Sequence, residues 1–132
     1  MIFYKNNTSE ITALLDTGNS LIDPISLSPV IIAEYKSVKN LFPEAVRNGL
    51  ERFESNNLEM IMSEVNDKGL STRVIPFTSL GKENGMILGF VPDRVEIHDE
   101  CGVRVLGKCV IGIYNSSLSK DRSYAALLNP YL

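Results

Sequence analysis

The most informative stretch of this sequence is Ala13-Leu14-Leu15-Asp16-Thr17-Gly18-Asn19-Ser20. Three apolar side chains run directly into Asp16, which predicts a core strand that ends at a carboxylate. Gly18 permits a tight turn and the close approach of another backbone, and the Thr17 hydroxyl can lock that turn against a neighbour. Asn19 then places a polar amide beside the carboxylate. The stretch therefore predicts a strand followed by a turn that presents Asp16.

A carboxylate on such a turn becomes an effective acid–base catalyst when a second one meets it. Two carboxylates about 3 Å apart cannot both ionise easily, so the pair shares one proton. One member then acts as a general base on water while the protonated member polarises a peptide carbonyl. This chemistry needs no metal and no covalent intermediate, so we expect no cofactor.

The second carboxylate of such a pair has no candidate within the chain, because Asp-Thr-Gly occurs once. The other aspartates are followed by Pro, Lys, Arg, Glu and Arg, and none is on a matching turn: Asp23, Asp67, Asp93, Asp99 and Asp121. A two-fold homodimer brings the same residue of two subunits together by construction. We therefore expect Asp16 to meet the Asp16 of a second copy.

A second short motif, Val110-Ile111-Gly112, comes about ninety residues after the turn. In retroviral-type aspartic proteases an apolar-apolar-Gly strand threads beside the catalytic turn. We therefore expect Val110, Ile111 and Gly112 to lie beside Asp16 and to be followed by a helix.

Short β-rich runs broken by Gly, Pro, Asn and Asp dominate the chain, whose 132 residues fit a single domain, 1–132. The pattern predicts an all-β barrel or sandwich, and with the Asp16 turn and Val110-Ile111-Gly112 we expect a retroviral-type protease-like barrel. The expected strands are Ile11–Leu15, Val30–Ile32, Thr72–Phe77, Met86–Phe90, Val95–His98, Val103–Leu106 and Val110–Tyr114, with Leu58–Val65 as a further apolar run with polar interruptions.

One or two short helices are expected within this barrel. Between Pro43 and Glu54 the apolar residues Val46, Leu50 and Phe53 share a helical face, and Pro43 suits a first turn. A second helix is predicted from Asp121 to Leu128, with the aspartate as its N-cap.

A protease of this type needs a hairpin that covers the substrate and excludes water. Asn84-Gly85 is a strong turn signal, so a substrate-facing hairpin is expected at Gly81, Lys82, Glu83, Asn84 and Gly85. The stretch Val65–Leu70 is an alternative place for it.

Composition excludes several classes of function. The net charge of −3, with acids and bases interspersed, gives no basic footprint for nucleic acid. No apolar run approaches the roughly 18 residues that cross a bilayer, so the fragment is expected to be soluble. The only cysteines, Cys101 and Cys109, are expected to be reduced, although they could face each other across a hairpin. With His98 they match no common zinc spacing, so no metal is expected.

The chain resembles a known family in several motifs that together span nearly its whole length. It is similar to the C-terminal protease domain of the sporulation sigma-E factor processing peptidases of spore-forming Gram-positive bacteria. The resemblance is carried by Ala13–Leu21 with Asp23-Pro24 and Pro29-Val30, Arg73–Phe77, Gly81–Gly85, Leu88–Phe90 with Pro92-Asp93, Val110–Asn115, Leu118-Ser119 and Tyr124–Leu128.

This resemblance implies properties that composition does not show. The full protein would join a membrane-embedded N-terminal domain, absent here, to this protease domain on the cytoplasmic side of the sporulation septum. The substrate would be a sigma factor precursor that loses its N-terminal pro-segment. The domain would act as a homodimer, and a signalling protein would activate it through the membrane domain.

A rival interpretation is a catalytically silent, protease-like module that senses or scaffolds a partner. The missing second Asp-Thr-Gly motif favours this rival.

Overall fold

The computed structural model describes residues 1–51, 58–77 and 85–132. This part of the chain forms two β-sheets with three short α-helices and one turn of 3-10 helix. The expected all-β, protease-like class is confirmed. The strands are β1 (Ile2–Tyr4), β2 (Asn7–Ser9), β3 (Ala13–Leu15), β4 (Val30–Glu34), β5 (Thr72–Phe77), β6 (Gly85–Phe90), β7 (Arg94–Asp99), β8 (Gly102–Val105), β9 (Val110–Tyr114) and β10 (Ala126–Leu128).

The larger sheet has six strands in the order β3-β10-β4-β9-β6-β5. Two of its pairs are parallel, β3 with β10 and β4 with β9, and both join segments far apart in the sequence. The other pairs are antiparallel, and β5 pairs with β6 along its whole length from Thr72 to Phe77. The C-terminal strand β10 therefore lies between β3 and β4, inside the sheet.

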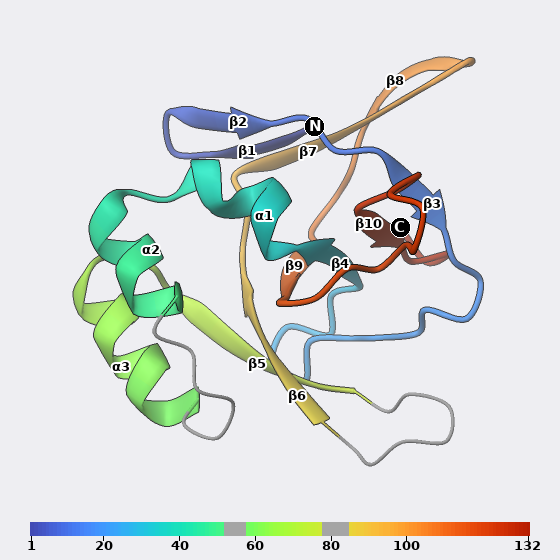
Figure 1. Cartoon of the computed structure of the whole chain (residues 1–132). Helices are drawn as coiled ribbons and strands as arrows, with labels where there is room; N and C mark the ends of the chain where they lie inside the picture. Colours follow the sequence, from blue (N-terminus) through green and yellow to red (C-terminus); the bar gives the residue numbers. More distant parts are fainter. Residues whose placement is uncertain (52–57, 78–84) are drawn as a thin grey trace.

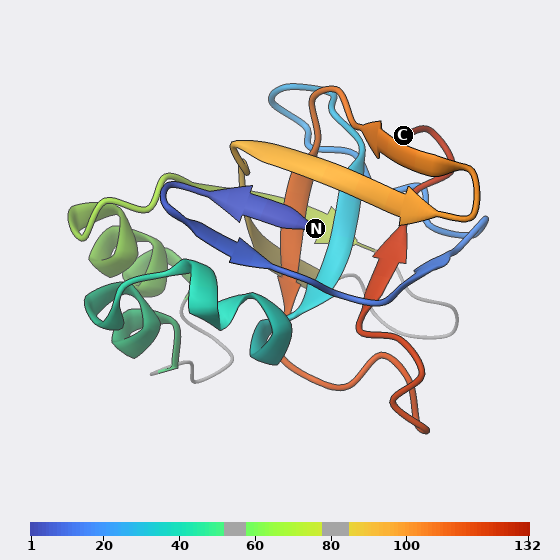
Figure 2. The same cartoon turned by 90° about the horizontal axis from the view of Figure 1, so that it is seen from above.

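The smaller sheet has the order β2-β1-β7-β8 and covers one side of the larger one. Viewed from above, β7 crosses over β4 and β9 (Figure 2). Side chains between the layers form the main core, in which the rings of Tyr4, Phe42 and Phe90 meet edge-to-face at centroid distances of 5.0 to 5.9 Å. Aromatic pairs prefer this arrangement.

The helices gather at one end of the sheets, away from β3 and β10 (Figure 1). They are α1 (Tyr35–Val38), the 3-10 turn η1 (Lys39–Leu41), α2 (Glu44–Glu51) and α3 (Leu58–Asp67). Helix α2 confirms the predicted helix after Pro43, whose carbonyl accepts from the N–H groups of Val46 and Arg47. None of the helices in the described ranges combines the length and apolar character needed to span a bilayer.

Helix α3 corrects two sequence expectations. The run Leu58–Val65 was grouped with the β-rich segments, but it is helical. The alternative covering hairpin at Val65–Leu70 is the end of this helix, because the N–H of Leu70 donates to Val65 O and that of Gly69 to Asn66 O. These two bonds make a Schellman cap, and Gly69 supplies its left-handed residue with φ +97°.

The helix expected from Asp121 to Leu128 is absent, and residues Ala126–Leu128 form strand β10 instead. The carboxylate of Asp121 caps a local turn by accepting from the Ser119 hydroxyl and the Ser123 N–H. These bonds, with that from Ser119 the strongest, lower the pKa of Asp121 to about 2. Arg122 has φ +60°, a left-handed conformation that cannot start a helix.

Candidate active site

The Asp16 turn lies at the end of β3. The N–H of Asp16 donates to Leu128 O at 3.2 Å, and the N–H of Asn19 returns to Asp16 O at 3.0 Å. The Gly18 N–H donates to Asp16 Oδ1 at 2.9 Å. A Cβ on Gly18 would lie 3.3 Å from that same oxygen, so only glycine fits here without a shift. The half-buried carboxylate is thus fixed by its own turn and still reaches solvent.

Strand β3 is an edge strand and not the core strand that its apolar sequence predicts. Ala13, Leu14 and Leu15 are all exposed, with Leu14 at 45% and Leu15 at 59%. Among the described residues only β10 pairs with β3, so within that part of the chain the other side of β3 is an open edge of the sheet. The apolar side chains beside Asp16 therefore form surface.

Thr17 and Asn19 have opposite environments. The Thr17 side chain is exposed, and no hydrogen bond of its hydroxyl is found among residues 1–51, 58–77 and 85–132. Asn19 is 4% exposed, and its Nδ2 donates to Val30 O at 3.1 Å and to Leu127 O at 3.3 Å. The amide thus ties the turn to the neighbouring strands.

Asn129 is a site residue that the sequence analysis missed. It is 1% exposed, and its Nδ2 donates to Leu21 O at 2.9 Å while its Oδ1 accepts from the Tyr131 N–H. The available signal was a polar amide directly after the apolar run Ala125–Leu128. It was overlooked because that run was interpreted as a helix.

Asp23 is a second missed residue, with a fully buried side chain behind the turn. Its carboxylate accepts from the Ser26 hydroxyl at 2.7 Å and from the Ile25 N–H, and it pairs with Arg73 Nε at 3.5 Å. Burial would raise the pKa of Asp23, but these donors and the arginine charge bring it below its usual value. Asp23 thereby organises the loop that leads from the turn to β4.

The strand next to the turn is β10, and the expected neighbour Val110-Ile111-Gly112 lies further away. These three residues begin β9, and β10 and β4 stand between β9 and β3. One link between them and the turn is Val30, which pairs with Val110 and accepts from Asn19. Gly112 permits close packing here, because a Cβ would lie 2.6 Å from Ile87 Cδ1. The predicted helix after Gly112 is also absent.

Most of the expected substrate-facing hairpin lies outside the described residues. This applies to Gly81, Lys82, Glu83 and Asn84, whereas Gly85 begins β6 and pairs with Phe77 of β5. In the described residues β5 and β6 are two paired strands at the far edge of the six-stranded sheet from β3.

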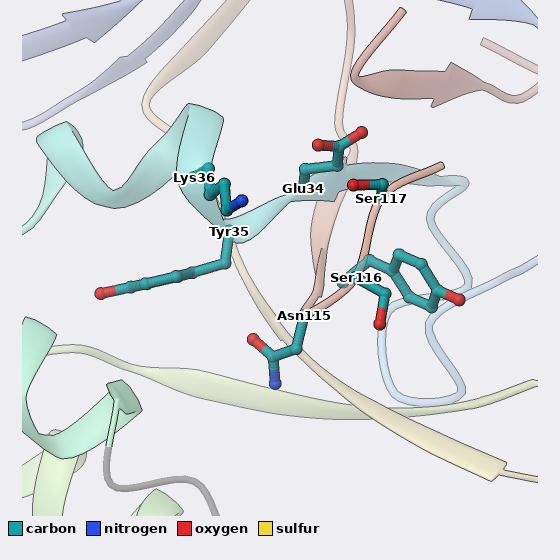
Figure 3. A pocket seen from close by; sticks show the side chains of 7 residues that line it. Glu34, Tyr35, Lys36, Asn115, Ser116 and Ser117 are labelled. Carbon is teal, nitrogen blue, oxygen red and sulfur yellow. The ribbon is translucent and has the colours of Figure 1, made fainter. Parts of the chain in front are cut away.

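A groove of about 710 Å³ opens between the two sheets beside β3. Leu15, Ile31 and Leu128 line its apolar side, and charged residues of β7 and β8 such as Glu96 and Arg104 line the other. A smaller cavity of about 140 Å³ lies at the opposite end of β4 and β9 from Val30. Glu34 and Ser117 are among the residues that line it (Figure 3). The Glu34 carboxylate accepts from the Leu118 N–H at 3.0 Å.

The cysteines lie in different environments. Cys101 is exposed in the turn between β7 and β8, whereas Cys109 is buried, and both are free. Burial raises the pKa of the Cys109 thiol to about 11, so it stays protonated. Across the described part of the chain, no group of three or more His, Cys, Asp or Glu side chains is arranged to hold a metal ion.

Comparison with known protein families shows which family this chain belongs to. The sequence model of the sporulation factor SpoIIGA family, a peptidase family, matches residues 1–132. The chain belongs to this family.

Relatives in the SpoIIGA family carry the name sporulation sigma-E factor-processing peptidase. The one from Priestia megaterium is 29% identical over 99% of this chain and 42% of its own length. The one from Bacillus subtilis is 30% identical over 95% of this chain and 40% of its own length. The chain thus spans about two fifths of these relatives. The comparison with solved structures found no significant match.

The family assignment confirms the resemblance that the sequence motifs indicated. It also covers the Asp16 turn, the buried amides and β10, because the match extends over the whole chain.

Proposed function

We propose that this chain is the aspartic endopeptidase domain of a sigma factor-processing peptidase and that it cleaves peptide bonds with Asp16. The observation that carries the proposal is the fixed Asp-Thr-Gly turn in a chain of a peptidase family. The turn holds one oxygen of Asp16 and leaves the carboxylate open to solvent, as a group that must reach water and a peptide requires.

The active unit in this proposal is a two-fold homodimer with one Asp16 from each chain. The two carboxylates share a proton, so the ionised one activates water and the protonated one polarises the scissile carbonyl. The roles of the two carboxyl groups then exchange as the leaving amine is protonated. The exposed Leu14, Leu15 and Tyr131, which is 74% exposed, supply apolar surface near the turn for such contact. Thr17 is also free to reach the second copy.

The proposed substrate is a sigma factor precursor, from which an N-terminal pro-segment is removed. This follows from the names of the relatives and from the motif resemblance. In the same proposal, residues 1–132 form one protease domain that acts on the cytoplasmic side of the septum membrane. A signalling protein activates it through an N-terminal membrane domain.

Replacement of Asp16 by Asn in the full-length protein tests the proposal. Asp16→Asn replaces the carboxylate by an amide of nearly the same size, so the turn should keep its geometry but the pair can no longer share a proton. We therefore expect precursor cleavage to be lost while the protein is still present at its normal level. Asp67→Asn, at the exposed end of α3, is the matched control and should cleave normally. Immunoblots of precursor and product in sporulating cells give the measurement. Wild-type levels of cleaved product in cells that stably express Asp16→Asn would overturn the proposed role of Asp16.

A further inference from the structure

Two buried side-chain amides enclose the segment that leaves the Asp16 turn. Asn19 donates from Nδ2 to Val30 O and Leu127 O, and its Oδ1 accepts from the Leu21 N–H at 3.2 Å. Asn129 donates from Nδ2 to Leu21 O at 2.9 Å. The peptide groups of Leu21 are therefore held on both sides, by one amide at the N–H and by the other at the carbonyl. We call this arrangement of Asn19, Leu21 and Asn129 the amide clamp.

Loss of a hydrogen bond in the amide clamp should destabilise the fold, because both amide side chains are almost completely shielded from water. Asn19 is 4% exposed and Asn129 is 1% exposed. A buried donor or acceptor that loses its partner costs about 1–3 kcal/mol, more than the bond itself contributes. Both nitrogens point at carbonyl oxygens and both oxygens accept an N–H, so only an amide satisfies all these partners.

The clamp acts on both chain segments that flank Asp16. On the incoming side, β3 pairs with β10, and Asn129 directly follows β10. On the outgoing side, Asn19 lies three residues after Asp16 and bonds to Leu127 of the same strand. The direct bonds of Asp16 itself are the backbone bond to Leu128 and the bonds within the turn. The clamp therefore holds both segments between which the carboxylate stands.

We propose that Asn19 and Asn129 are positioning residues for Asp16, which they hold in the place where it meets its symmetry mate. This inference rests on the proposed function. Catalytic groups need placement within roughly 0.5 Å of the productive geometry, and a misplacement of about 1 Å can cost a hundredfold in rate. The separation of two carboxylates also sets how strongly they share a proton. A loosened clamp should therefore change both the turnover rate and its pH dependence.

Asn129→Ala and Asn129→Asp in the full-length protein provide the test. For Asn129→Ala we expect kcat to fall about 10- to 100-fold with KM close to that of the wild type, and the acid limb of the pH profile to shift. Asn129→Asp keeps the shape but presents a carboxylate to Leu21 O. Once protonated it regains an O–H donor, so its activity relative to wild type should rise as the pH falls.

A core variant distinguishes positioning from stability. Val65→Ala removes methyl groups from fully buried Val65 of α3, away from the turn, and lowers the melting temperature without touching the clamp. If Asn129→Ala and Val65→Ala, compared at equal folded fraction, show the same kcat and the same pH profile, the positioning role is wrong. Asp16→Asn is assayed alongside: if it still cleaves, the proposed function fails, whereas an inactive Asp16→Asn with fully active Asn129→Ala overturns the clamp alone.

Discussion

The carboxylate of Asp23 is buried behind the turn, where it accepts from Ser26 and Ile25 and pairs with Arg73. Its pKa in the folded protein lies below the usual value of about 3.9. A depressed pKa stabilises the fold above the unfolded-state pKa, and this contribution is lost as the pH falls through the folded-state pKa. The residue thus links the loop before β4 to strand β5 most strongly at neutral pH.

Asp23→Asn should therefore destabilise the protein in a pH-dependent way. We expect the free energy of unfolding at pH 7 to fall by about 1.5–3 kcal/mol, the range for hydrogen bonds to charged groups. The difference from wild type should narrow below about pH 4, as the wild-type carboxylate becomes protonated. Urea unfolding at a series of pH values measures it. A difference that stays constant between pH 7 and pH 3 would contradict the role of the charge.

Gly112 provides a second prediction at this scale. A Cβ at this position would lie 2.6 Å from Ile87 Cδ1 and 3.2 Å from Val30 Cγ1. Gly112→Ala should therefore destabilise the fold by about 1–3 kcal/mol, as overpacking does. The double variant Gly112→Ala with Ile87→Val removes the nearest methyl group and should be destabilised by less than the sum of the two single changes. Thermal unfolding of the wild type, the two single variants and the double variant gives the four stabilities of a double-mutant cycle. If the two single destabilisations simply add in the double variant, the proposed clash between the Cβ and Ile87 is wrong.

Among the elements, strands bounded by turn residues were predicted from sequence, whereas β1, β2 and β10 were missed. Thr72–Phe77 and Val110–Tyr114 were found with their observed bounds because turn residues limit each run. Strands β1 and β2 were missed, and β2 reads Asn7-Thr8-Ser9, with no apolar side chain. Its strand conformation comes from pairing with β1, which a local pattern does not reveal.

The candidate site divides in the same way. Asp16, Gly18 and the turn were predicted because their chemistry is local. Asn129 was missed because its partner Leu21 lies far away in the sequence. Asp23 bonds locally to Ile25 and Ser26, but its ion pair with the distant Arg73 and its burial are not visible in the local sequence. The exposure of β3 was missed because an apolar sequence alone does not distinguish a buried core strand from an exposed edge strand.

The Schellman cap of α3 gives a prediction at the scale of elements. Gly69 has φ +97°, where a side chain with a Cβ is strained by about 1–2 kcal/mol. Gly69→Ala should lower stability by that amount, and Gly69→Asn by less, since asparagine tolerates left-handed conformations. Chemical denaturation measures both. Equal stability of the alanine variant and the wild type would show that the cap does not constrain this helix end.

At the scale of the whole molecule, the proposed active site requires two copies of the chain. The exposed edge strand next to Asp16 is the place where the second copy would make apolar contact. A charged side chain introduced on this strand should oppose association of the two copies, because the charge would be removed from water without gaining an oppositely charged partner.

Leu15→Glu should therefore weaken self-association roughly tenfold or more, given the cost of burying an unpaired charge. Val103→Glu on β8 is the matched control, because Val103 is 61% exposed, close to the 59% of Leu15, but lies on the other sheet. Sedimentation over a concentration series compares the two variants with the wild type. An equal effect of both substitutions, or none from Leu15→Glu, would place the dimer contact elsewhere.

The position of β10 inside the sheet also has a consequence for synthesis of the protein. Residues Ala126–Leu128 separate β3 from β4, and Asn129 completes the amide clamp. While the ribosome still holds this segment, the Asp16 N–H lacks its acceptor Leu128 O and the Asn19 Nδ2 lacks Leu127 O. The strands β3 and β4 on either side cannot be joined. The Asp-Thr-Gly turn is therefore completed only after Ala126–Leu128 has joined the sheet, later than the neighbouring pairs β4–β9 and β5–β6 can form.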